Sequence, residues 1–332
     1  MTQGPRPRKQ RGPQIPPGWL DPLRQQQPLV SRTWLLRAVG ISFAVALLCA
    51  YLTMCLLFYQ GGWQILFHPS HAVPSTPANV GMRFDDIHFN STETGQPQLT
   101  GWWIPTEPGA RHSSSILLYL HGASGSLSDT LPQLKMLHPL GINIFVIDYR
   151  GFGHSVNVHP SEATVSEDAA AAIAYLTDTR RLGPTSIVLY GEGLGANVAA
   201  DVALRHPLVA ALILVNPVPP ALEQIAADRR TGLLPIRLLF ADRFDLASKL
   251  KQITTPKLFL QTQTGPAGEI APRYLQSLYS LAADPKRMIL AQGALDVDGM
   301  VNFLEHSLPL HETGTKTPDP QPATAHSSET TR

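Results

Sequence analysis

The chain has 332 residues, of which 43% are hydrophobic and 15% charged, and its formal net charge is +1. This composition is apolar for a soluble protein and ordinary for a chain with a membrane span. The near-neutral charge gives no reason to expect a nucleic acid or an acidic polymer as partner. Both cysteines, Cys49 and Cys55, lie in one apolar stretch, so the remainder can form neither a disulfide framework nor a cysteine-based zinc site.

The first 37 residues are rich in Pro, Gln and Arg, with seven basic residues against one acidic residue. Such a segment buries too little apolar surface to offset its ordering entropy, so we expect 1–37 to be a disordered, basic, cytoplasmic segment. Residues 38–59 then contain no charge. As a helix they would span about 33 Å, enough for a hydrocarbon core of about 30 Å, which predicts a transmembrane helix. A buried core helix and a cleaved signal peptide are the alternatives, and a signal peptide would have a shorter apolar region.

The excess of basic residues before this helix sets the expected orientation. The first basic residue after the apolar stretch is Arg83. By the positive-inside rule, the N-terminus is cytoplasmic and the main domain lies on the periplasmic or extracytoplasmic side of a single-pass protein. The lipid bilayer is therefore an expected partner, through residues 38–59.

From about residue 80 the pattern alternates between strands and helices. Two segments alternate apolar and polar residues, as half-buried antiparallel strands do, and six short apolar runs suit strands buried on both faces. The predicted strands are 83–89, 99–104, 116–120, 142–147, 186–190, 211–215, 258–261 and 288–290, and the predicted helices are 166–179, 196–205, 272–281 and 297–308. This alternation predicts an α/β domain over 60–310 with a mostly parallel sheet flanked by helices. Residues 218–246 form a longer insert that suits a short cap, and the tail 311–332 reads as disordered.

Three short sequences follow predicted strands in order: LHGASG at 120–125, DYRGFGHS at 148–155 and YGEGLG at 190–195. They resemble, respectively, the HG oxyanion loop, the D-x-R-G-x-G-x-S turn and the nucleophile elbow G-x-S-x-G of the α/β-hydrolase superfamily. The resemblance covers about 65–308. It is closest to the N-terminally membrane-anchored, short-capped α/β-hydrolase-domain proteins, and it implies the α/β-hydrolase fold.

The resemblance also places a catalytic triad, and all three of its positions have changed. The nucleophile position reads Gly193, which has no side chain. The acid position reads Gly268, with Glu269 one residue away, and the histidine position reads Asp296. The next histidine, His306, lies ten residues further on, inside the last predicted helix. No catalytic residue is therefore expected at these positions, because acyl transfer needs a nucleophile with a base beside it.

The oxyanion hole of this family is made of backbone N–H groups, which the resemblance assigns here to Ala123 and Leu194. Intact backbone beside three lost side chains favours a non-catalytic pseudohydrolase that binds a ligand or partner. The alternative is an esterase or acyl hydrolase that cleaves esters or amides through non-standard residues. Candidates for such residues are Glu192 paired with Asp296, the serines Ser124 and Ser126, and His121.

The sequence gives no pattern for a metal or a cofactor. The 12 histidines are scattered without H-x-x-x-H or H-E-x-x-H spacing, and no P-loop is present. The glycines at 191, 193 and 195 do not complete a dinucleotide loop, because Ala196 stands where its third glycine is needed. We therefore expect no metal and no cofactor. An apolar small molecule or a peptide is the candidate ligand, no nucleic acid is expected, and the protein partner stays open.

Overall fold

The computed structural model of the chain describes residues 31–90, 98–227, 229–262, 271–291, 293 and 295–308. Internal contacts divide the chain into two units, Met1–Leu57 and Phe58–Arg332. The predicted tail 311–332 lies outside the described residues, as does most of the predicted N-terminal segment 1–37.

The first helix, α1 (Arg32–Gly61), is 30 residues long and has a mean hydropathy of 2.4 in its most apolar window. Its length of about 45 Å and its composition are sufficient to cross a membrane. It begins six residues before the predicted start at 38, so residues 32–37 are helical and the prediction of disorder there is wrong. The reason is a cap at Ser31, whose side-chain oxygen accepts a hydrogen bond from the Trp34 N–H at 3.2 Å.

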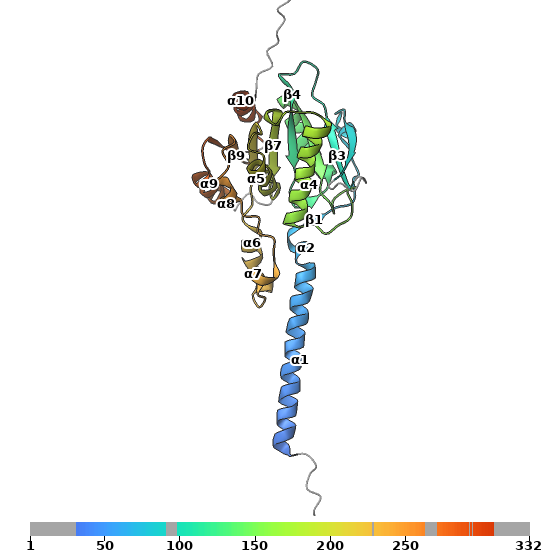
Figure 1. The fold of residues 1–332 in the computed structure, drawn as a ribbon, viewed down its shortest axis with the longest axis vertical. Coiled ribbons are helices and arrows are strands. Elements are labelled where there is room, and N and C mark those ends of the chain that lie inside the picture. Colours follow the sequence, from blue (N-terminus) through green and yellow to red (C-terminus); the bar gives the residue numbers. More distant parts are fainter. Residues whose placement is uncertain are drawn as a thin grey trace, which may run out of the picture. The chain divides into compact units, whose positions relative to one another are not determined.

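An eight-stranded sheet forms the second unit, in the order β10-β9-β8-β7-β4-β6-β3-β2 (Figure 1). Strands β2 and β3 run antiparallel to their neighbours, and the other pairs are parallel. The mostly parallel sheet predicted from the alternation is thus confirmed. Its strands are β2 (Asp85–Phe89), β3 (Leu99–Ile104), β4 (His112–Leu120), β6 (Ile142–Asp148), β7 (Ile187–Glu192), β8 (Ala211–Val215), β9 (Lys257–Gln261) and β10 (Lys286–Leu290).

Helices cover both faces of this sheet. The core on one face takes apolar side chains from α4 (Glu162–Ala174), α5 (Gly195–Arg205), α8 (Leu246–Leu250) and α9 (Ala271–Leu281). The core on the other face takes them from α3 (Leu131–Leu137) and α10 (Val297–Ser307). Burial of these apolar stripes against both sheet faces is the main stabilising contribution.

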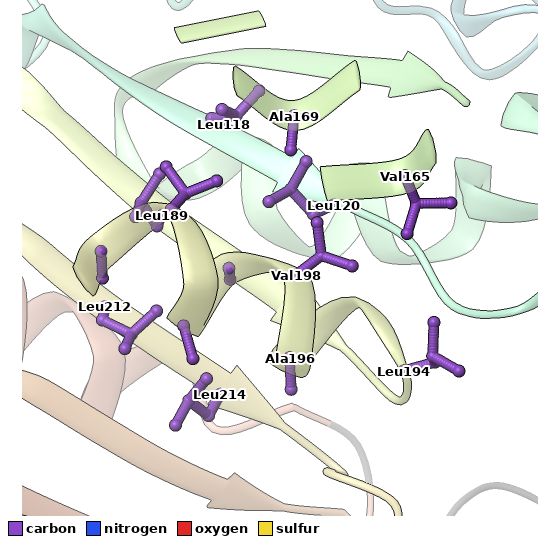
Figure 2. Packing of buried hydrophobic residues seen from close by; sticks show 14 of the residues in the cluster. Leu118, Leu120, Val165, Ala169, Leu189, Leu194, Ala196, Val198, Leu212 and Leu214 are labelled. Atoms are coloured by element: carbon purple, nitrogen blue, oxygen red, sulfur yellow. The ribbon is translucent and has the colours of Figure 1, made fainter. Parts of the chain in front are cut away.

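Figure 2 shows how two helices meet the middle of the sheet. Val165 and Ala169 on α4, and Val198 on α5, approach leucines that project from β4, β7 and β8. Helix α4 starts at Glu162, four residues before the predicted start at 166. Its cap is Ser161, whose side chain accepts a hydrogen bond from the Thr164 N–H at 3.2 Å.

Short elements complete the second unit. A small parallel pair joins β1 (His68–Pro69) to β5 (Ser124–Gly125), directly after α2 (Trp63–Leu66). Residues 218–246, the predicted cap, contain α6 (Ala221–Ala227) and α7 (Ile236–Leu239), which stand out from the sheet in Figure 1. Single turns of 3-10 or π type lie at Pro77–Val80, Leu127–Thr130, His138–Leu140, Tyr175–Thr179, Pro184–Ser186 and Arg229–Thr231.

Candidate functional site

The three motif loops meet at one edge of the sheet. Strands β4, β6 and β7 are parallel neighbours, with β4 in the middle. Each motif loop follows the carboxyl end of one of these strands. Loops at the carboxyl ends of parallel strands share one edge, which is where α/β sheets bind their ligands.

The turn between β7 and α5 is built by tight glycine packing. A Cβ at Gly191 would lie 2.4 Å from the carbonyl oxygen of Gly195, and a Cβ at Gly195 would lie 2.1 Å from the carbonyl oxygen of Leu120. No side chain fits at either place, so both outer glycines are needed for the helix to approach the sheet so closely.

The central residue of the turn, Gly193, is different. Its φ is +58°, and its N–H donates a hydrogen bond to the Val215 carbonyl at 2.9 Å. The nearest atom to an added Cβ would be Gly122 Cα, at 4.0 Å. The apex therefore has room for a side chain, and only the left-handed backbone conformation, which costs about 1–3 kcal/mol in other residues, favours glycine there. The turn has the shape that presents a nucleophile, without a nucleophilic atom.

The two residues assigned to the oxyanion hole are Leu194, which directly follows Gly193, and Ala123, which lies in the loop after β4. Leu194 is buried and directly precedes α5, where the first N–H groups of a helix have no partner within the helix. Ala123 is half-buried in the loop after β4, and its carbonyl accepts a hydrogen bond from the His68 N–H at 2.8 Å. The β1–β5 pairing thus fixes the backbone of that loop.

His121 is a buried part of the scaffold. One ring nitrogen, Nδ1, lies 2.8 Å from the Gly122 carbonyl, and the other, Nε2, lies 3.6 Å from Asp148 Oδ1. Burial lowers the pKa of His121 to about 4 and raises the pKa of Asp148 to about 8. Although the spacing is that of an ion pair, both groups are therefore neutral near pH 7. The ring also packs on Tyr149 and Phe152, at centroid distances of 4.6 and 5.1 Å, which favours a loop-organising role over catalysis.

Glu192 has a partner that sequence reasoning missed. Its carboxylate accepts a short hydrogen bond from the Tyr119 hydroxyl, and burial raises the pKa of Glu192. The Tyr119 and Tyr190 rings meet edge to face at 4.7 Å, because these two residues pair across β4 and β7. The only signal in the sequence is that both tyrosines stand near the carboxyl ends of predicted strands, Tyr119 directly before the motif LHGASG and Tyr190 as the first residue of YGEGLG.

Asp296 serves as the cap of α10. Its Oδ1 accepts a hydrogen bond from the Gly299 N–H at 2.9 Å. The proposed carboxylate pair therefore does not form in the described structure, since Glu192 binds Tyr119 and Asp296 binds a helix end. His306 lies within α10 and is exposed, with Nδ1 2.7 Å from the Asn302 carbonyl. The expected acid position, Gly268, and its neighbour Glu269 lie outside the described residues.

The remaining candidates are the two serines of the loop after β4. The Ser126 hydroxyl is buried and donates a hydrogen bond to the Ala72 carbonyl at 2.8 Å. Ser124 is exposed on β5. Among the described residues, no group of three or more His, Cys, Asp or Glu side chains has the arrangement of a metal site.

Comparison with known proteins settles the family. Residues 111–287 match the family model described as serine aminopeptidase, S33. This chain belongs to that α/β-hydrolase family. An uncharacterized protein of Mycobacterium tuberculosis is 30% identical over 258 residues, which cover 77% of this chain and 87% of that protein. The α/β hydrolase domain-containing protein WAV2 of Arabidopsis thaliana is 27% identical over 228 residues, covering 64% of this chain and 71% of WAV2.

Solved structures confirm the predicted α/β-hydrolase fold. An esterase of Pyrococcus furiosus superposes with a TM-score of 0.57 at 18% identity, covering 74% of this chain and 99% of the esterase. An α/β hydrolase of Vibrio vulnificus gives a TM-score of 0.53 at 22% identity, covering 69% of this chain and 81% of that one. At such low identity the likeness concerns the fold alone.

Proposed function

We propose that this α/β-hydrolase-family protein is a membrane-anchored pseudohydrolase, which binds an apolar small molecule or peptide at the carboxyl edge of the sheet. The observation that carries the proposal is Gly193. The elbow keeps its two packed glycines and its left-handed apex, yet the apex has no side chain.

Acyl transfer by this fold needs an attacking atom at the apex and a base that accepts its proton. In the proposed alignment Gly193 cannot attack, and Asp296 stands in the place of the base. The Asp296 carboxylate binds the Gly299 N–H and so is engaged in holding α10. We assign the third triad position to Gly268. No acyl-enzyme can form at an apex that has lost its nucleophile.

Ligand binding would depend on the backbone N–H groups of the site rather than on its side chains. We assign the oxyanion hole to the N–H groups of Ala123 and Leu194. Two such donors stabilise a carbonyl or carboxylate oxygen even when no covalent step follows. A ligand with one such oxygen and an apolar body fits this arrangement.

The membrane anchor is α1. Three observations support it: a length of 30 residues, a mean hydropathy of 2.4, and apolar side chains such as Leu36 and Phe43, which are 72% and 65% exposed. Exposed apolar surface on this scale needs a partner, and a bilayer provides one. The seven basic residues before the apolar stretch favour a cytoplasmic N-terminus and an extracytoplasmic main domain.

Hydrolysis of nitrophenyl esters by the full chain tests the proposal. We expect the native chain and a Gly193→Ala control to release nitrophenol no faster than buffer, because neither has a nucleophile at the apex. The control adds a Cβ without adding chemistry. Turnover by the native chain above the buffer rate would contradict the pseudohydrolase and support hydrolysis through non-standard residues.

A further inference from the structure

Two leucines in the cap are almost fully exposed. Leu238 is 83% exposed and Leu233 is 81% exposed, the highest values for large apolar side chains outside α1 in the described residues. Ile65, Val156 and Val158 are 41%, 43% and 40% exposed. We refer to these five side chains as the apolar rim. Scattered surface leucines need no explanation, but several on one edge of a domain indicate a partner surface.

The rim residues belong to segments at the carboxyl edge of the sheet. Val156 and Val158 lie in the loop after β6, and Leu233 and Leu238 lie in the cap after β8. Ile65 lies in α2, two residues after Trp63, whose ring stacks on His159 at a centroid distance of 4.7 Å. These connections place the rim around the same edge as the elbow.

Gly62, directly before α2, also lies close to the cap. A Cβ at Gly62 would lie 3.6 Å from Cδ2 of Phe240, the residue that follows α7. Further along, the Ser70 carbonyl accepts a hydrogen bond from the Gly153 N–H at 2.8 Å. The segment 62–70 therefore contacts both the cap and the loop after β6, the two other segments that carry rim residues.

The covalent chain keeps this edge close to α1. Helix α1 ends at Gly61, and β1 begins at His68 and pairs with Ser124 in the loop after β4. Seven peptide steps at no more than about 3.6 Å each span at most about 25 Å. This limit comes from chain length and holds for every orientation of the domain. If α1 crosses a bilayer, His68 therefore lies within about 25 Å of the end of that helix.

We propose that the apolar rim docks on the lipid bilayer that holds α1, with Leu233 and Leu238 in the interfacial layer, so that the site at the carboxyl edge takes its ligand from the membrane. This inference rests on the membrane anchor of the proposed function. Residues 221–245 contain four basic and four acidic residues. Because these charges cancel, docking depends on apolar insertion, and neutral lipids suffice.

The test uses the full chain in phosphatidylcholine nanodiscs, with Cys49→Ala and Cys55→Ala to remove the native thiols. A fluorophore is attached to a single new cysteine, Leu238→Cys in one protein and Leu208→Cys in another. Leu208 is the matched control, because it is 68% exposed but lies in the turn before β8, at the opposite end of that strand from the cap. Quenching by a lipid-bound nitroxide is compared with quenching by aqueous iodide.

We expect the nitroxide to quench the label at position 238 several-fold more than the label at 208, with iodide showing the reverse order. Equal behaviour of the two labels would overturn the docking. Protection of position 238 from both quenchers would also overturn it, because a protein rather than lipid would then cover the rim. Extraction of the full chain from vesicles by alkaline carbonate would contradict the anchor itself. If the chain stays in the vesicles during carbonate treatment but the label at position 238 is quenched by iodide and not by the nitroxide, the docking alone is contradicted.

Discussion

Replacing Asp148 by asparagine removes a carboxyl group that is fully buried and lies 3.6 Å from His121 Nε2. Burial raises the pKa of Asp148 to about 8 in the folded chain, whereas an unfolded chain gives about 3.9. Between these values the folded state holds a proton that the unfolded state has released. The free energy of unfolding therefore falls as pH rises through this range.

His121 acts in the opposite direction at lower pH. Burial lowers its pKa to about 4, against about 6.5 when unfolded, so the unfolded state binds the extra proton between these values. Its contribution to the free energy of unfolding rises with pH up to about 6.5 and offsets the fall from Asp148. Above pH 6.5 only Asp148 of this pair continues to titrate. Between pH 6.5 and 8 the folded state holds one more proton than the unfolded state over about 1.5 pH units. At about 1.4 kcal/mol per unit, the free energy of unfolding falls by about 2 kcal/mol.

The asparagine of the Asp148→Asn variant keeps an oxygen for the Leu127 N–H, which donates a hydrogen bond to Asp148 Oδ1 at 3.1 Å. Urea unfolding of residues 62–312, followed by tryptophan fluorescence, measures the effect; this segment contains both apolar cores. Between pH 6.5 and 8, we expect the free energy of unfolding to fall by about 2 kcal/mol more in the native domain than in the Asp148→Asn variant. Asp85→Asn, at an exposed carboxylate, is the control and should keep the native slope. Equal slopes in native and Asp148→Asn proteins would refute the reasoning.

Three further predictions test the site, and the first two use the same unfolding assay. Gly191→Ala should destabilise the domain by several kcal/mol more than Gly193→Ala. The alanine Cβ at 191 would lie 2.4 Å from a backbone oxygen, whereas the Cβ at 193 would have no atom nearer than 4.0 Å. Equal decreases in the free energy of unfolding would contradict the described turn. Asp296→Ala should cost about 1 kcal/mol, the usual value of a lost helix cap, and a neutral result would argue against that role. Tyr119→Phe should raise the pKa of Glu192 further, since the tyrosine hydroxyl lowers that pKa; an unchanged value in carbon NMR of the Glu192 carboxyl would argue against the hydrogen bond.

Strand positions are the most predictable part of the fold, although β3, expected to be half-buried, is buried along nearly its whole length. The ranges 99–104 and 211–215 were predicted with the bounds that the structure has, because continuous apolar or alternating patterns mark a strand in its own sequence. The start of β4 was missed. Residues 112–115 read His-Ser-Ser-Ser, and they join the strand only because His112 pairs with Ile142. Local polarity could not show a pairing between distant segments.

In the candidate site, too, local features could be predicted from the sequence and long-range contacts could not. The apex at Gly193 could be placed from sequence because glycines at fixed spacing mark the turn itself. The Tyr119 partner of Glu192 could not, because it lies 73 residues away and depends on the register between β4 and β7. Likewise the exposure of Leu233 and Leu238 depends on how the domain covers α7 and the turn before it, which no short pattern records.

Labelling by a fluorophosphonate, read by intact mass and peptide mapping, tests the central claim most directly. The native chain is compared with the triple substitution Gly193→Ser, Gly268→Asp and Asp296→His. We predict no adduct on the native chain and one adduct on the variant, at position 193. An adduct on a native serine would contradict the pseudohydrolase, and an unlabelled variant would contradict the assignment of the three positions.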